Sequence, residues 1–192
     1  MAKKSLLVLV LAAIVAGGAF AQEAKWYNSY APGIDGSNLL VNVGIGFGIL
    51  PYKMSLPPIS ASIEYAGLKI PLSIGGYFGI AGYDEDVGFT NYSATMTGFG
   101  ARAAWHFGLL ENLDTYVGLN LGWMIYSQKV HTPEIKNSYG GTPAIDTEND
   151  LSAFFYGFNI GARYFFTKNI GVYVELGYSA ISVASAGLSL KF

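Results

Sequence analysis

The 192-residue sequence contains no cysteine and only two histidines. Without cysteine there are no disulfides, so other interactions must hold the folded chain together. A lipid-modified N-terminal cysteine is excluded for the same reason. Charged residues make up 12% of the chain, against about 25% in soluble domains. This low charge points away from an ordinary soluble surface.

Long apolar runs are also missing after the first 21 residues. A membrane-spanning helix needs about 20 apolar residues, and no later segment provides them. Hydrophobic residues nevertheless make up 52% of the chain, which indicates that they are spread in alternation. Removing Lys3 and Lys4 from the 11 basic residues leaves nine against 13 acidic residues, a net charge near −4. That balance does not favour nucleic-acid binding.

The N-terminal segment has the three-part layout of a secretory signal peptide. Lys3 and Lys4 precede an apolar run of 11 residues, 6–16, which is too short for a spanning helix. Small residues follow and end in Ala19-Phe20-Ala21, an A-x-A cleavage pattern. We therefore predict a cleavable signal peptide over residues 1–21, a periplasmic lead-in over 22–36 and a barrel domain over 37–192.

Alternation with a period of two begins after the lead-in. Leu39, Val41 and Val43 share one face of the first segment, and Asn42 and Gly44 lie on the other. The same pattern recurs and predicts eight strands, an even number, of which the second is shortened by Pro57 and Pro58. The predicted strands cover residues 38–49, 59–65, 70–81, 98–107, 116–126, 154–166, 170–179 and 183–192.

The connections between the predicted strands alternate in length. Outer-membrane barrels have short periplasmic turns and longer external loops, so both termini are expected in the periplasm. The last external connection, 180–182, is very short and departs from this trend. The short connections are 67–68, 108–113 and 167–169, and the long ones are 51–58, 84–93 and 128–150.

The charged residues of the strands gather on the glycine-rich face, and the opposite face is apolar. A soluble barrel such as a lipocalin would have the reverse arrangement, with apolar residues inside. Aromatic residues on the apolar face lie toward the strand ends, as in the girdles at the two membrane interfaces. The fold class predicted is all-β, a closed eight-stranded antiparallel up-and-down transmembrane β-barrel. The inward charged residues are Glu64, Arg102, His106, Arg163, Glu175 and Lys191.

On these features the chain resembles the small eight-stranded outer-membrane barrels, the group of the OmpA transmembrane domain, OmpX and OmpW. The resemblance covers roughly residues 38–192 and includes a last strand that ends in Phe192. In that family an aromatic C-terminal strand is the signal read by the barrel-assembly machinery. The resemblance thus implies an assembly role for Phe192 and an outer-membrane location, but it names no substrate.

Four inward charges define the candidate site: Glu64, Arg102, Arg163 and Glu175. Their charges cancel, as buried ions require. If Phe166 faces Ile170, Tyr173 lies opposite Arg163 with Glu175 diagonal to it, within reach of a long side chain. The group is either a gate that controls leakage or a structural network that fills a narrow barrel. Eight strands leave just enough interior for side chains, which favours the structural interpretation.

Catalysis and metal binding have little support in the sequence. Neither His106 nor His131 shows the His-x-Ser arrangement of the barrel deacylases, and no His–Ser pair is visible at an outward rim. Asp84-Glu85-Asp86 lacks a calcium-ligand pattern, so no metal or other cofactor is expected.

The sequence therefore predicts a non-enzymatic outer-membrane barrel with an envelope-structural or surface-interaction role. The alternative is a narrow, porin-like channel for small and even hydrophobic molecules, and a lipid-modifying enzyme is the third class. The expected partners are outer-membrane lipids, the assembly machinery and an extracellular partner reached through the long loops.

Overall fold

The computed structural model describes residues 38–47, 54–68, 70–110, 112–137 and 140–192. The predicted signal peptide and lead-in lie outside this range. No helix that could cross a membrane occurs in the described part of the chain. Its strands are β1 (Asn38–Phe47), β2 (Met54–Ala66), β3 (Leu72–Val87), β4 (Thr90–Leu110), β5 (Leu113–Thr132), β6 (Ile135–Asn137), β7 (Gly140–Thr142), β8 (Ile145–Phe165), β9 (Ile170–Tyr178) and β10 (Ala184–Lys191).

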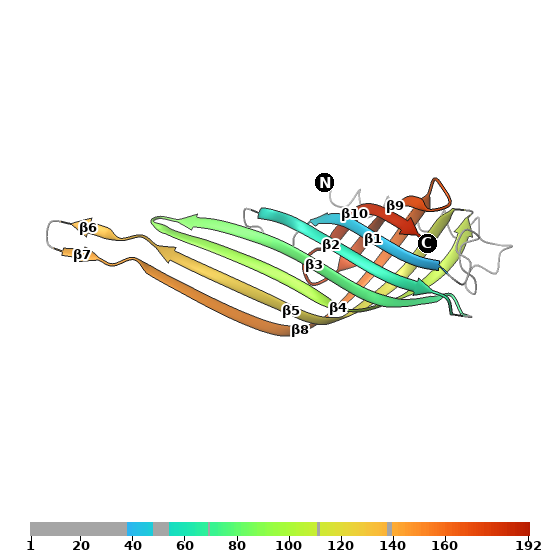
Figure 1. Ribbon diagram of the computed structural model, residues 1–192, viewed down its shortest axis with the longest axis horizontal. Helices are drawn as coiled ribbons and strands as arrows, with labels where there is room; N and C mark the ends of the chain where they lie inside the picture. Colours follow the sequence, from blue (N-terminus) through green and yellow to red (C-terminus); the bar gives the residue numbers. More distant parts are fainter. Residues whose placement is uncertain (1–37, 48–53, 69, 111, 138–139) are drawn as a thin grey trace, which may run out of the picture.

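Eight of these strands close into a barrel in the order β1-β10-β9-β8-β5-β4-β3-β2, and β6 and β7 form a separate hairpin (Figure 1). All neighbouring barrel strands are antiparallel. The seam is completed by two backbone hydrogen bonds of 2.9 Å between Leu39 and Phe192. The predicted closed eight-stranded barrel is confirmed.

The long connections are shorter than the sequence predicted, because the strands extend into them. β3 and β4 run on to a tight turn between Val87 and Thr90, so the predicted loop 84–93 is mostly strand. β5 and β8 stay paired as far as Thr132 and Ile145, inside the predicted loop 128–150. These segments are polar, and polarity suggested loops. A sheet outside the bilayer, however, needs no apolar outer face.

Two prolines also failed to shorten the second strand. β2 begins at Met54 and includes Pro57 and Pro58. Its pairing with β3 shifts register twice, between Met54 and Leu56 and between Leu56 and Ile59. These irregularities accommodate residues that cannot donate to the ladder.

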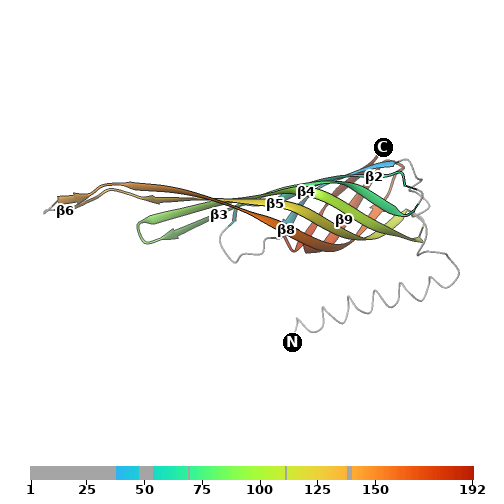
Figure 2. The ribbon, with the colours of Figure 1, turned by 90° about the horizontal axis from the view of Figure 1, so that it is seen from below.

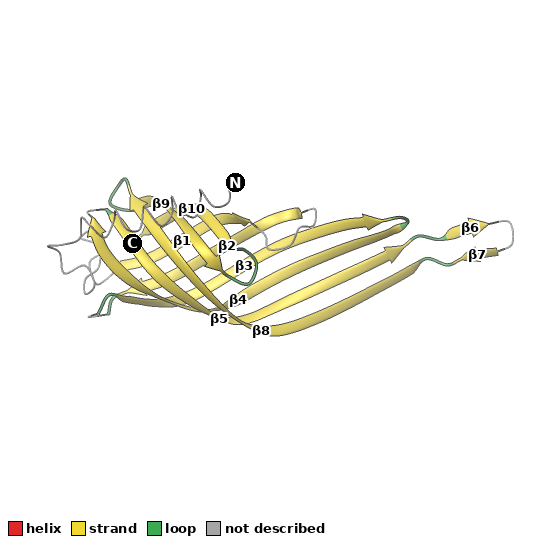
Figure 3. Ribbon diagram, turned by 180° about the vertical axis from the view of Figure 1, so that it is seen from behind, coloured by secondary structure: helices red, strands yellow, loops and turns green. Residues whose placement is uncertain are grey.

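Beyond the barrel, β3, β4, β5 and β8 continue as a four-stranded sheet that we call the arm, residues 81–96 and 126–151 (Figure 2). The β6–β7 hairpin lies at the tip of its longer half, as Figure 3 shows from the other side. The arm extends from the end of the barrel opposite Phe192.

The outer face of the barrel is apolar and exposed, as expected for a surface in contact with lipid. Val43, Leu121 and Val174 are 49%, 42% and 55% exposed. Aromatic side chains occupy both ends of this face, and at the arm end Trp123 packs edge-on against Phe154 with ring centroids 5.3 Å apart. The exposed aromatic residues include Tyr65, Tyr164, Phe166 and Phe192 toward the short turns and Phe47, Trp123, Phe154, Tyr156 and Tyr178 toward the arm.

The short connection between β9 and β10 folds into the barrel rather than away from it. Ala180 and Ile181 are fully buried in an apolar cluster with Tyr77 and Phe155. The Tyr77 hydroxyl donates a 2.8 Å hydrogen bond to the Ser179 carbonyl. A Cβ at Gly79 would lie 2.5 Å from the end of the Ile181 side chain, so a larger residue there would require Ile181 to shift. The connection therefore plugs the arm end of the lumen, which explains its departure from the loop-length trend.

Candidate functional site

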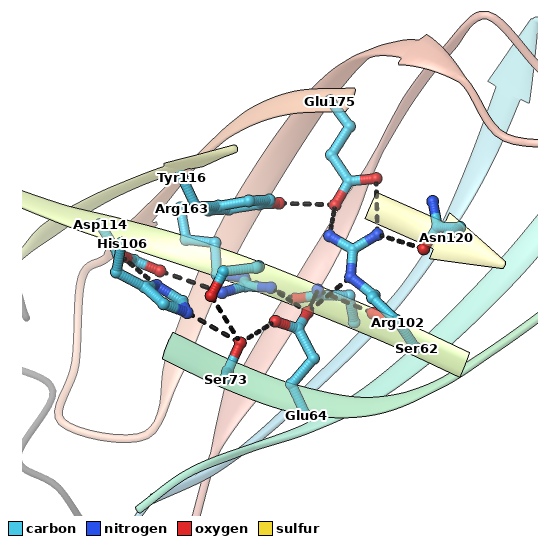
Figure 4. A network of polar contacts seen from close by, with 12 residues as sticks. Ser62, Glu64, Ser73, Arg102, His106, Asp114, Tyr116, Asn120, Arg163 and Glu175 are labelled. Carbon is cyan, nitrogen blue, oxygen red and sulfur yellow. Dashed lines mark hydrogen bonds and ion pairs between the residues drawn. The ribbon is translucent and has the colours of Figure 1, made fainter. Parts of the chain in front are cut away.

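The structure brings the four predicted lumen charges together (Figure 4). Arg102 on β4 contacts Glu64 on β2 through Nε at 2.9 Å. Its Nη2 contacts Glu175 on β9 at 2.5 Å. Arg163 on β8 donates from Nη2 to the same Glu64 oxygen that Arg102 contacts. All four side chains are at least nine-tenths buried.

The expected register is confirmed, but the expected pairing is not. Tyr173 lies opposite Arg163, with Glu175 two residues further along β9. Glu175 nevertheless pairs with Arg102 and accepts a 2.6 Å hydrogen bond from the Tyr116 hydroxyl. Register defines neighbours within the sheet, whereas Arg102 reaches Glu175 across the lumen.

Several further residues join the network. Arg163 donates from Nη1 to Asp114 at 3.0 Å and from Nε to Asn42 at 3.2 Å. The Tyr116 ring lies under the Arg163 guanidinium, 4.1 Å from its centroid to Cζ. Ser73 completes the set, so that seven of the eight barrel strands contribute a side chain. Sequence reasoning missed Asp114, although its position two residues before the inward Tyr116 was a signal for it.

His106 contacts an acidic residue and a serine through its two ring nitrogens. The Ser73 hydroxyl donates a 2.6 Å hydrogen bond to Glu64 Oε2. His106 Nε2 lies 2.8 Å from the same hydroxyl oxygen, and His106 Nδ1 lies 2.8 Å from the Asp114 carboxylate. Because the one hydroxyl proton is directed to Glu64, we predict hydrogen on both ring nitrogens.

The predicted protonation of His106 would balance the charges of the lumen. Arg102, Arg163 and a His106 with hydrogen on both nitrogens supply three positive charges. Glu64, Asp114 and Glu175 supply three negative ones. Each ion has a partner of opposite sign within 3.0 Å, as burial of charge demands. Such pairing is typical of a network that fills and fixes a core.

Ser73, His106 and Asp114 have the connectivity of a hydrolase triad. A nucleophilic serine gives its proton to a neutral histidine. Here the Ser73 hydroxyl donates to Glu64 instead. All three side chains are fully buried. This group has no local sequence signal, because Ser73 and His106 are 33 residues apart.

The network and the plug leave the interior filled. Arg163 and Tyr116 are 0% and 2% exposed inside the barrel. The ring of Tyr116 lies directly over Gly161, where a Cβ would meet it at 2.4 Å. Toward the arm, Tyr77 and Ile181 are buried in one apolar cluster.

The two faces of the arm reverse the polarity seen on the barrel. On the outward face, the paired residues across the four strands are first Ile80, Thr97, Ile125 and Ser152. Two residues further along each strand, away from the barrel, they are Gly82, Thr95, Ser127 and Asp150. Beyond them the outward residues are mostly charged or polar, which puts the membrane boundary here. On the inward face, apolar side chains become exposed: Val87 57%, Ile145 53% and Leu151 67%.

Side-chain contacts on the polar outer face join β5 to β8. Lys129 Nζ lies 2.6 Å from Glu148, and His131 Nδ1 lies 2.6 Å from Asp146. The hydrogen bond to Glu148 raises the pKa of Lys129 above its usual value. Both contacts join residues that lie directly opposite each other in the β5–β8 ladder, and exposed contacts of this kind add little to stability.

The acidic run Asp84-Glu85-Asp86 lies in β3 of the arm, where alternation puts Glu85 on the face opposite its two neighbours. Among the described residues, no three His, Cys, Asp or Glu side chains are grouped to hold a metal ion. Phe192, the expected assembly signal, ends the chain with its ring 66% exposed on the outer face.

A closed antiparallel barrel with an apolar outer face and a filled polar lumen defines an integral membrane β-barrel. The chain belongs to the family described as the outer membrane protein beta-barrel domain, whose model matches residues 6–192. No curated protein matches the chain.

Two kinds of solved barrel are similar to it. One is the N-terminal β-barrel domain of OprF from Pseudomonas aeruginosa, at 16% identity over 85% of this chain and 100% of that chain, with a TM-score of 0.46. The other is Ail, the attachment invasion locus protein of Yersinia pestis, in complex with the heparin analogue sucrose octasulfate. Its identity is 13% over 81% of this chain and 97% of that chain, with a TM-score of 0.48.

Proposed function

We propose that this protein is a non-enzymatic outer-membrane barrel whose arm forms an interaction surface outside the bilayer. The observation that carries the proposal is the polarity of the arm. Its outer face bears most of the charges, and its inner face, which also carries Glu85, exposes Val87, Ile145 and Leu151 to solvent. Apolar side chains on a sheet face that neither lipid nor core covers are a feature of binding surfaces.

The edge of β8 supports the same proposal. β8 pairs with β9 only from Phe158 onward, so residues 145–157 have no strand beside them on that edge within the described chain. Unpaired N–H and C=O groups of an edge strand can add a strand from a partner. A partner strand along β8 would also reach the exposed Leu151 on the inner face.

The filled lumen favours this role over the channel alternative. Passage would require moving the ion network and the Ser179–Ser182 connection together, and both are buried. The hydrogen bond that Ser73 donates to Glu64 argues likewise against hydrolysis. We expect planar bilayers that contain the purified protein to show no steady conductance.

Site-specific photo-crosslinking in living cells tests the interaction surface. A photoreactive phenylalanine analogue replaces Leu151 on the inner face or Ser127, the control on the outer face of β5 and away from the β8 edge. We expect a discrete higher-mass adduct from position 151 and none from position 127. Equal adducts from both positions, or none from 151 in any growth condition, would contradict the proposal.

A further inference from the structure

The inner face of the arm contains a small cavity next to the mouth of the barrel. Its volume is about 140 Å³, more than the roughly 30 Å³ share of one water molecule. Its wall includes Tyr83, Glu85, Tyr92, Ala94, Tyr126 and Gln128, from β3, β4 and β5. The cavity lies on the side of the sheet that continues into the lumen.

The register explains why a hollow forms at this point. Ala94 lies opposite Tyr83 on β3 and opposite Gln128 on β5. Along its own strand, the next residue on the same face toward the turn is Tyr92, which lies opposite Glu85. A methyl side chain thus forms the floor, and larger side chains surround it.

One polar atom in this wall has no partner. Tyr83 is 4% exposed, and its buried hydroxyl makes no hydrogen bond to any other described residue. Buried hydroxyl groups are normally satisfied, so an orphaned one beside a hollow points to a ligand. The unsatisfied Tyr83 hydroxyl is an observation separate from the shape of the cavity.

The charge and the aromatic character of the wall select the ligand. Three tyrosines line the cavity, and the negative π-face of a tyrosine ring attracts cations. Glu85 adds a carboxylate on the cavity's face of β3, and Asp84 borders it. No lysine or arginine belongs to the described wall.

From this geometry we propose that the cavity binds an alkylammonium or guanidinium group. The rings of Tyr83, Tyr92 and Tyr126 enclose the cation, and the Glu85 carboxylate pairs with it. The inference deepens the proposed function and rests on it, since the cation would be a lysine or arginine side chain of a docked partner or a free organic amine.

The test uses the folded full barrel in detergent micelles with ¹³C-labelled tyrosine rings, followed by NMR. The free probe is N-acetyl-lysine methylamide, and its neutral control is the Nε-acetylated form. The peptide probe is a six-residue peptide with a central lysine, controlled by the norleucine peptide. We expect the lysine probes to shift the ring signals of the three cavity tyrosines and the neutral probes to leave them unchanged. Binding of the free probe alone indicates a small amine, and binding of the peptide indicates a partner side chain.

Variants give the recognition its sharpest test. Glu85→Gln should weaken binding about tenfold, equivalent to about 1.4 kcal/mol. Asp86→Asn removes the same charge from the opposite face of β3 and should leave affinity unchanged. Ala94→Leu should fill the cavity and abolish binding, with the barrel still migrating as a folded species in an unboiled gel.

Three results would overturn the inference: equal shifts with neutral probes, equal losses in Glu85→Gln and Asp86→Asn, or no shift at all. The crosslink at position 151 does not depend on this cavity. If that adduct forms while the lysine probes leave the tyrosine ring signals unchanged, the proposed ammonium site is wrong and the proposed interaction surface is still supported.

Discussion

Replacing Arg163 by methionine is the perturbation that the lumen network makes easiest to predict. The side chain donates to Glu64, Asp114 and Asn42 and is fully buried. Methionine keeps most of its length and removes its charge, so the loss is electrostatic rather than a cavity. Two carboxylates then lose one cation between them.

The expected loss follows from what each carboxylate keeps. Glu64 retains Arg102 and Ser73, and Asp114 retains His106. Breaking a buried ion pair by removing one partner costs about 3–5 kcal/mol. Because both carboxylates keep some partner, we expect about 3 kcal/mol, the lower end of that range. Adding Asp114→Asn to Arg163→Met should recover part of the lost unfolding free energy. The second substitution removes a carboxylate that the first deprives of a partner, and the effects of substitutions at contacting residues are not additive.

Urea titration of the barrel in lipid vesicles, followed by tryptophan fluorescence, measures this loss. The matched control is Lys168→Ala, which removes one positive charge from an exposed position between β8 and β9. The control should shift the unfolding free energy by less than about 0.5 kcal/mol. Equal small shifts in Arg163→Met and the control would show that the lumen charges are hydrated, and the network argument would fail.

Three further predictions follow from the same structure. Leu121→Arg on the outer face should lose about 2–4 kcal/mol of folding free energy in vesicles. Ser127→Arg, on the same face of β5 but in the arm, should lose little. Equal losses would show that the membrane boundary has been put at the wrong position. ¹⁵N NMR of His106 should show hydrogen on both ring nitrogens, and a bare Nε2 beside Ser73 would reopen the question of catalysis. External protease on intact cells should cut at residues 143–144, between β7 and β8, and spare 167–169; the opposite result would invert the topology.

The barrel could be predicted from the sequence because its outer face must be apolar. Alternation of Leu39, Val41 and Val43 against Asn42 leaves one arrangement in lipid, and β1 has it. The arm escaped prediction because outside the bilayer that requirement ends. Asp84 and Glu148 resemble loop residues, yet cross-strand pairing keeps both in strands.

The membership of the lumen site was easier to predict than its contacts. Alternation along each strand identified four inward-facing charged residues, because the direction of each side chain follows from its own strand. These residues are Glu64, Arg102, Arg163 and Glu175. Partners across the lumen depend on barrel closure and on long side chains, so the pair Arg102–Glu175 has no local signal. The plug is similar, because Ile181 meets Gly79, about a hundred residues away in the chain.

The central claim is that the apolar outer face is covered by lipid. It is tested most directly by diluting the urea-unfolded barrel domain, residues 37–192, into buffer, with or without lipid vesicles. Folding is then assessed by gel mobility before and after boiling and by sedimentation. The account predicts a folded, heat-modifiable monomer only where vesicles are present. A folded, soluble monomer in plain buffer would contradict it.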